Sequence, residues 1–172
     1  MFSCRKNALL FMTILSLILL PTGLSFSLEK PTSAILLEIS GNISVFNTDM
    51  KKAVFDRSLL RQFKRVTIQT HTPWTDGLTT FVGILIRDIL QAVGAQGQTI
   101  EATAINDYSV PIPIKDFMNH DVILADTRNG TTMSVRDKGP LWIIYPWDSN
   151  PELRTEIYHS RSIWQLHQIT IK

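Results

Sequence analysis

The chain has 172 residues, with 17 Lys and Arg against 15 Asp and Glu, which gives a formal charge of +2. This near balance, and the absence of a basic run with interleaved aromatic residues, exclude the electrostatic footprint of a nucleic-acid-binding protein.

The N-terminal segment, residues 1–27, predicts a secretory signal peptide. Arg5 and Lys6 precede an uncharged apolar run over residues 8–20, and small residues follow that run. The run is shorter than the roughly 20 residues that a membrane-spanning helix needs. A periplasmic or secreted location is therefore expected, and the alternative is an uncleaved membrane anchor.

Cleavage after Ser25 or Ser27 would leave one domain over residues 28–172. The leader carries two of the 17 basic residues and no acid, so the mature charge is 15 − 15 = 0. It also carries Cys4, the one cysteine of the chain. An exported domain without disulfides depends on its hydrophobic core, for which this length is sufficient.

The first half of the domain predicts strands and short helices in alternation. Patterns of β-rich runs, N-caps and Gly stops give these elements: a hairpin of 35–39 and 43–46 around Gly41-Asn42, a helix over 57–63 capped by Asp56, a strand over 66–70, a shaped loop over 71–77, a strand over 81–85 and a helix over 87–93 that ends at Gly94.

The second half continues with short strands and turns. The expected elements are a strand over 99–105, a loop over 106–108, an extended segment over 110–113, a helical turn over 114–119, strands over 122–125 and 141–145, and a closing strand over 165–171. Asn129-Gly130 is the strongest turn signal, because both residues tolerate positive φ. Residues 148–151 predict a loop that starts a short helix, and 158–164 give no clear pattern. The fold class is α+β, with a mixed or barrel-like sheet.

Four polar segments form the candidate site: residues 71–77, 106–109, 136–139 and the cluster 158–161. The first three are loops that follow strands, and such loops commonly carry function. If they converge, they bring together these ligand-binding candidates: His71, Trp74, Asp76, Asn106, Tyr108, Arg136 and Arg161. Arg clamps anions and Trp stacks on planar groups, so the mixture suits a small anionic or planar polar ligand.

Each candidate also has a structural interpretation. Trp74 could belong to the core, Asp76 could form a turn with Gly77, and Arg161 could pair with Glu156 or Asp148. The sequence contains no G-x-S-x-G motif, no H-E-x-x-H motif and no Gly-rich phosphate loop. The four histidines are scattered and no pair has the spacing of metal ligands on a helix, so no metal site is predicted.

Several segments together resemble the sulfite-oxidase-like, molybdopterin-binding domain family. These segments are Phe81 to Leu90, similar to F-x-G-x-x-L-R-D-L-L; Asn106 to Ser109 with Ile112-Pro113, similar to G-Y-S…P; Asp121 to Leu124, Asn129-Gly130 and Gly139 to Leu141, similar to V-L-L-A…N-G…G-x-P-L; and Arg161 to Trp164, similar to K-S-V-K-W. The resemblance covers about residues 33–171 and implies a single domain with the mixed-sheet sulfite-oxidase fold.

The resemblance also implies site roles and one departure. Tyr108 matches the family's active-site tyrosine, and Arg161 matches a basic residue near the cofactor phosphate. In active members a cysteine thiolate from the loop before the F-x-G segment binds molybdenum, whereas that loop here, residues 71–77, has no cysteine. Molybdenum prefers soft sulfur donors.

Two hypotheses follow. The first is a non-catalytic binding module that uses the former cofactor cleft for a small ligand or for a partner, such as a periplasmic domain of a membrane protein. The second is a molybdopterin-dependent oxidoreductase with a cysteine-free metal site, in which the cofactor's own dithiolene sulfurs hold the metal.

Overall fold

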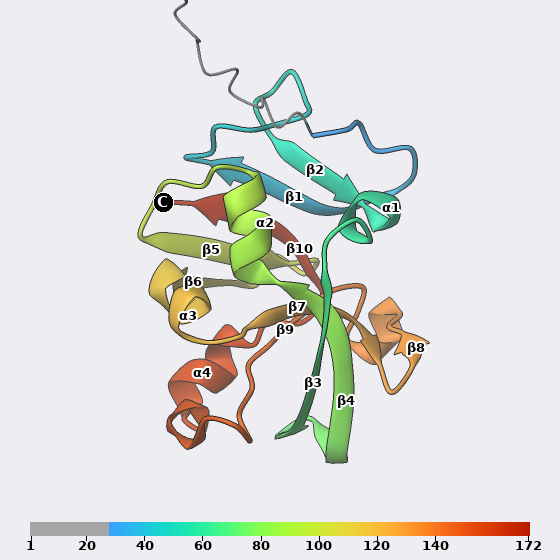
Figure 1. Ribbon diagram of the computed structural model, residues 1–172, viewed down its shortest axis with the longest axis vertical. Helices are drawn as coiled ribbons and strands as arrows, with labels where there is room; N and C mark the ends of the chain where they lie inside the picture. The colour runs from blue at the N-terminus through green and yellow to red at the C-terminus, as the bar shows by residue number, and fades with distance from the viewer. Residues whose placement is uncertain (1–27) are drawn as a thin grey trace, which may run out of the picture.

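The computed structural model describes residues 28–172, which form two packed β-sheets with short helices between strands (Figure 1). The predicted signal peptide, Cys4 and the predicted cleavage sites lie outside or at the edge of these residues. Among the described helices, none is long and apolar enough to cross a membrane.

The first sheet has the strand order β2-β1-β10-β5-β6. Its strands are β1 (Ile35–Gly41), β2 (Ala53–Asp56), β5 (Thr99–Ala104), β6 (Ser109–Pro113) and β10 (Leu166–Ile171). The pair β1–β10 is parallel and the others are antiparallel, so the sheet is mixed. The closing strand predicted from the sequence therefore lies in the centre of this sheet.

The second sheet is antiparallel and begins with the order β3-β4-β7-β8. Its strands are β3 (Arg65–Thr72), β4 (Thr75–Leu85), β7 (Ile123–Arg128), β8 (Thr131–Thr132) and β9 (Trp142–Ile144), of which β9 pairs with β7. The long β3–β4 hairpin extends below the first sheet (Figure 1). The α+β class and the mixed sheet are confirmed, but the sheets do not close into a barrel.

The helices are short. They are α1 (Arg57–Leu60), α2 (Ile86–Ala92), α3 (Ile114–Asn119) and α4 (Glu156–Arg161), with 3-10 turns at η1 (Val135–Asp137) and η2 (Pro151–Leu153). Asp56 caps α1 as predicted, since its carboxylate accepts from the Leu59 backbone N–H at 2.9 Å.

Two glycine positions have clear physical reasons. Asn129-Gly130 forms the predicted two-residue turn between β7 and β8, with φ values of 48° and 80°. Gly83 lies where β4 approaches β7 so closely that a Cβ atom would collide with the backbone of Leu124. This close approach explains the glycine of the F-x-G segment.

The predicted N-terminal hairpin is wrong. β1 pairs with β2 and β10 rather than with residues 43–46. The reason is a distant partner: the Asn42 backbone N–H donates to Ile171 at 3.2 Å, so the Gly41-Asn42 turn packs against the C-terminal strand. Local turn chemistry could not predict this pairing.

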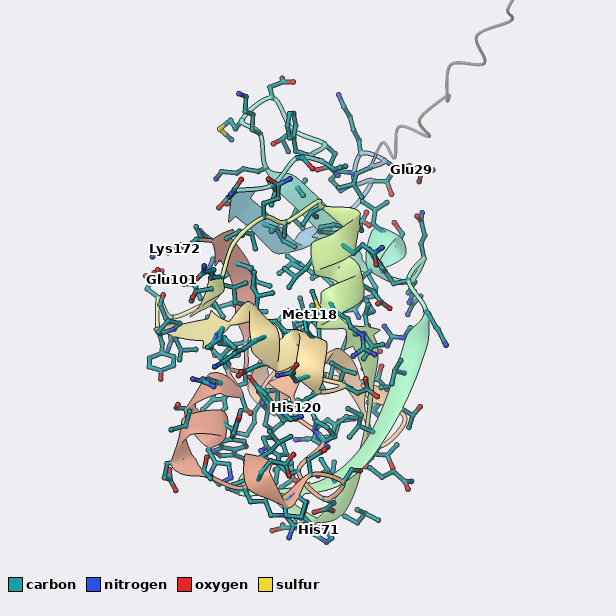
Figure 2. All side chains as sticks on the ribbon, turned by 60° about the vertical axis from the view of Figure 1, so that its left-hand side comes forward. Glu29, His71, Glu101, Met118, His120 and Lys172 are labelled. Carbon is teal, nitrogen blue, oxygen red and sulfur yellow. The ribbon has the colours of Figure 1, made fainter. Side chains whose placement is uncertain are left out.

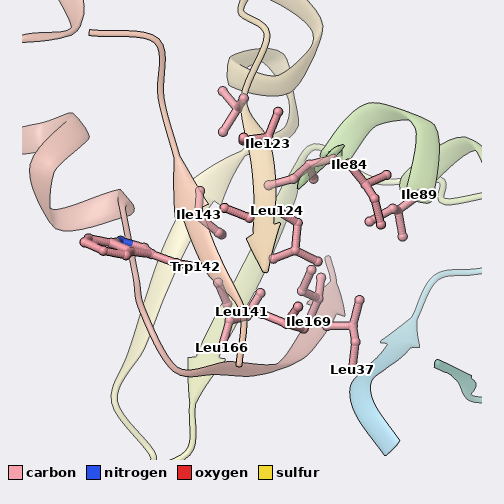
Figure 3. Packing of buried hydrophobic residues seen from close by; sticks show 14 of the residues in the cluster. Leu37, Ile84, Ile89, Ile123, Leu124, Leu141, Trp142, Ile143, Leu166 and Ile169 are labelled. Atoms are coloured by element: carbon pink, nitrogen blue, oxygen red, sulfur yellow. The ribbon is translucent and has the colours of Figure 1, made fainter. Parts of the chain in front are cut away.

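The core fills the space between the sheets. Leu37 and Ile169 from the first sheet pack with Leu124 and Ile143 from the second, as Figure 3 shows, and all four are almost fully buried. Trp142 also belongs to this core, and its position at the start of β9 places it beside the site described below.

Candidate functional site

A cleft of about 440 Å³ opens between the β3–β4 turn, the β5–β6 turn and α4. Its lining combines aromatic, small apolar and polar side chains: Trp74, Ala104, Asn106, Tyr108, Glu156, His159, Ser160, Ser162, Ile163 and Trp164. The size and the mixed lining are typical of a small-molecule site.

Trp74 is the centre of an aromatic cluster beside the cleft. Its ring centroid lies 5.5 Å from that of Trp164, 5.9 Å from Trp142, 6.0 Å from Trp147 and 5.9 Å from His159. All four tryptophans of the chain therefore meet here. Edge-to-face contacts at these distances are favourable beyond the burial of area, so the cluster makes a rigid wall.

The turn that carries Trp74 is tighter than predicted. The expected loop over 71–77 is wrong in extent, because β3 runs through Thr72 and β4 begins at Thr75. The Thr72 hydroxyl accepts from the Trp74 backbone N–H at 3.1 Å and lies 2.8 Å from the Thr75 hydroxyl. These bonds hold Pro73-Trp74 as a short connection between the two strands.

The β5–β6 turn forms the opposite rim. Asn106 accepts from the Tyr108 backbone N–H at 3.3 Å through its side-chain oxygen, and Asp107 between them has a φ of 65°. Tyr108 is 53% exposed, so its phenol stands at the mouth of the cleft and not in the core. The sequence predicted this turn and both of its lining residues.

The third wall is α4, which supplies Glu156, His159 and Ser160. The sequence marked residues 158–161 as a polar cluster, but it did not predict a helix or these lining residues. No residue of α4 is fully buried. The helix is therefore held to the body of the domain by a few specific contacts.

Arg161, at the end of α4, does not line the cleft. Its guanidinium donates to Asp116 at 2.8 Å, and the Tyr145 hydroxyl donates to the same carboxylate at 3.0 Å. Asp116 is 3% exposed. The burial of Tyr145, together with the negative charge of Asp116, raises the pKa of the Tyr145 hydroxyl far above its ordinary value. The predicted pairing of Arg161 with Glu156 or Asp148 is wrong, because Asp116 neutralises its charge instead.

His71 lies at the tip of the β3–β4 hairpin, as Figure 2 shows, and faces a separate depression of about 400 Å³. Its Nδ1 lies 2.7 Å from Asp148, which also accepts from Arg154 at 3.1 Å. Burial opposes ionisation of Asp148, but the hydrogen bonds from His71 and the charge of Arg154 outweigh it and lower the pKa of that carboxyl. His159 is the one residue that lines both this depression and the cleft.

The remaining two candidates lie apart from the cleft. Asp76 is exposed at the beginning of β4, and Arg136 is exposed in η1. The structure therefore brings together Trp74, Asn106 and Tyr108, and places the other four predicted residues elsewhere.

Lys138 is the cation nearest to the aromatic wall, and sequence reasoning did not single it out. Its Nζ lies 4.3 Å from the ring centroid of Trp164 and 5.8 Å from that of Trp142, within cation–π range. Within residues 28–172, no three His, Asp or Glu side chains gather closely enough to hold a metal ion.

A solved structure shares the fold. The crystal structure of the sulfane dehydrogenase SoxCD from Paracoccus pantotrophus matches with a TM-score of 0.57 and 19% sequence identity. The match covers 78% of this chain and 37% of that chain, so this chain spans little more than a third of the matched protein. At this identity the likeness shows the fold alone. No curated protein matches the chain in sequence.

The family model described as "Oxidoreductase molybdopterin binding domain" matches residues 50–149. The matched region begins just before β2 and includes Trp74, Asn106 and Tyr108 of the cleft. It covers more than half of the chain and agrees with the sulfite-oxidase-like fold. The chain belongs to the oxidoreductase molybdopterin-binding domain family.

Proposed function

We propose that the protein is a binding module whose cleft beside Trp74 and Trp164 holds a small planar polar ligand. The observation that carries this proposal is the gathering of all four tryptophans beside a cleft with a polar rim. A rigid aromatic wall stacks on a planar group, and a few polar side chains fix its orientation.

The polar groups are suited to orient such a ligand. Asn106 uses its side-chain oxygen in the turn, and its amide NH₂ has no hydrogen-bond partner in the described part of the chain. Tyr108 and His159 add a hydroxyl and an imidazole to the same lining. Amide, phenol and imidazole together offer both donors and acceptors, as a neutral heteroaromatic or amide ligand requires.

The residues present do not fit a molybdopterin cofactor. The loop that in the family carries the metal-binding cysteine holds Trp74, and residues 28–172 contain no cysteine. No Arg or Lys is among the lining residues, and the charge of Arg161 is neutralised by Asp116. Phosphate groups of cofactors are normally held by cations or by helix N-termini.

A molybdopterin-dependent oxidoreductase is the second candidate, and family membership is the observation that favours it. Molybdenum analysis of the protein purified from the compartment in which it resides separates the two candidates. Stoichiometric molybdenum would support the oxidoreductase and would contradict the binding module.

Benzamide is a suitable first probe, because it joins a planar ring to a neutral amide. We expect it to shift the indole N–H resonances of Trp74 and Trp164 in a ¹⁵N-labelled sample. Asn106→Ala should weaken binding, whereas the matched control Asn119→Ala, on α3 and outside this cleft, should not. Equal binding by both variants, or shifts confined to other residues, would contradict the proposal.

A further inference from the structure

We infer that the cleft prefers a planar anion, specifically a small aromatic carboxylate, and that Lys138 is the residue that recognises its charge. This inference rests on the proposed function, because it concerns the same cleft. It assigns the role of the cation to a residue other than Arg136 and Arg161, the two basic residues that the sequence favoured.

The first support is the position of the Lys138 ammonium. It lies 4.3 Å from the ring centroid of Trp164, which is a wall of the cleft. In the part of the chain that the structure describes, no Asp or Glu oxygen lies within 4.0 Å of this nitrogen, whereas Arg161, Arg65 and Lys52 each have such a partner. The charge next to the wall is therefore not neutralised by a carboxylate.

The second support is the backbone that holds Lys138. Its φ of 70° is in the left-handed region, which residues with a side chain rarely adopt. Its carbonyl accepts from the Gln165 N–H at 3.0 Å, and the neighbouring Gly139 N–H donates to Ser134 at 2.8 Å. An unfavourable conformation that is fixed by bonds on both sides commonly marks a functional position. Gln165 is also the residue after Trp164, so the same contact ties Lys138 to the wall.

The third support is the balance of charge around the cleft. Glu156 is the one carboxylate among the lining residues, but its side chain is 99% exposed and is therefore strongly screened by solvent. Lys138 is half-buried, so its field is screened less. The carboxylate of Asp116 is already bound to Arg161. An anion stacked near Trp164 would therefore meet a net attraction.

The ligand class follows from the combination of a stacking wall and one nearby cation. An aromatic ring would pack against Trp74 and Trp164, and the flexible side chain of Lys138, which borders the Trp164 ring without being among the lining residues, would turn its ammonium towards a carboxylate on that ring. Arg136 is the alternative residue for binding the carboxylate, because it is exposed and lies in the same loop, two residues from Lys138.

Benzoate and benzamide form the test pair, because they have nearly the same shape and differ in charge. In the full chain we expect benzoate to bind about fivefold more tightly at low salt, which corresponds to about 1 kcal/mol of attraction at partial screening. Lys138→Gln should remove this preference while leaving benzamide binding unchanged. Salt near 1 M, where the Debye length is about 3 Å, should also reduce it.

The outcomes distinguish this inference from the proposed function. If benzamide binds as tightly as benzoate, or if Arg136→Gln and not Lys138→Gln removes the preference, the role of Lys138 is overturned and the binding cleft stands. If neither compound shifts the resonances of Trp74 and Trp164, both proposals are contradicted. Thermal unfolding of Lys138→Gln checks that its effect is not a loss of folding.

Discussion

The guanidinium of Arg161 and the hydroxyl of Tyr145 donate to the same carboxylate oxygen of Asp116, at 2.8 and 3.0 Å. This buried group joins α3, the residue that follows β9 and the last residue of α4. Arg161 also lies 5.4 Å from the ring centroid of Tyr158 on the same helix. Because α4 has no fully buried residue, this network is an important attachment of the wall that carries His159 and Ser160, beside the aromatic contacts of Tyr158 with Tyr145 and of His159 with Trp74.

Replacing Arg161 with Met should therefore lower the free energy of unfolding by about 3 kcal/mol, because it leaves the buried Asp116 charge without its partner. Tyr145→Phe removes one hydrogen bond and should cost about 1 kcal/mol. Urea denaturation measures both. Arg136→Met, at an exposed position, should stay within about 0.5 kcal/mol of the original chain. A similar effect at positions 136 and 161 would contradict the anchoring role.

Trp74 is predicted to stabilise the hairpin tip as well as to form the wall. Trp74→Ala removes four aromatic contacts from a half-buried position and should cost about 2 kcal/mol, less than a fully buried tryptophan. Trp74→Phe should recover part of this loss. Leu78→Ala, on the same hairpin and 57% exposed, is the control and should have little effect on the unfolding midpoint. A loss at Leu78 equal to that at Trp74 would argue against the cluster.

Asp56 should make the fold sensitive to acid. Hydrogen bonds from Ser58, from the Leu59 N–H and from Thr32 and Ser33 outweigh burial and hold the pKa of Asp56 well below its ordinary value. Because the folded-state pKa is depressed, this stabilisation is complete above the unfolded pKa and is lost as the pH falls towards the folded value. The difference in unfolding free energy between the original chain and Asp56→Asn should therefore shrink from about pH 6 to about pH 2. A constant difference over this range would contradict the assignment.

Export remains a prediction from the sequence, and it has a direct test. Intact-mass analysis of protein recovered from the periplasm or medium should give a chain that begins at Phe26 or Leu28, after cleavage behind Ser25 or Ser27. Recovery of the full precursor with Cys4 in the membrane fraction would favour an uncleaved anchor instead.

Local sequence signals predicted the elements whose causes are local. The Asp56 cap, the Asn129-Gly130 turn and the strand at β10 all follow from residues within a few positions of one another. The failures have distant causes. Gly41-Asn42 has the sequence of a hairpin turn, but the Asn42 backbone N–H bonds to Ile171, which lies 129 residues further along the chain.

The same distinction applies to the candidate site. Trp74, Asn106 and Tyr108 could be predicted because each lies in a turn that follows a strand. The role of Arg161 could not, because Asp116 approaches it from α3, 45 positions away. Lys138 lies in the polar segment 136–139 but was not named as a candidate, since its proximity to Trp164 depends on the pairing of the Gln165 and Lys138 backbones.

The central claim is that the cleft beside Trp74 holds a small planar ligand in place of a metal cofactor. The most direct measurement is molybdenum and pterin content of the chain after expression and export in a host that makes the cofactor. We expect both to stay far below one equivalent, while benzamide still shifts the indole resonances of Trp74 and Trp164. Equimolar molybdenum and pterin that survive gel filtration would contradict it.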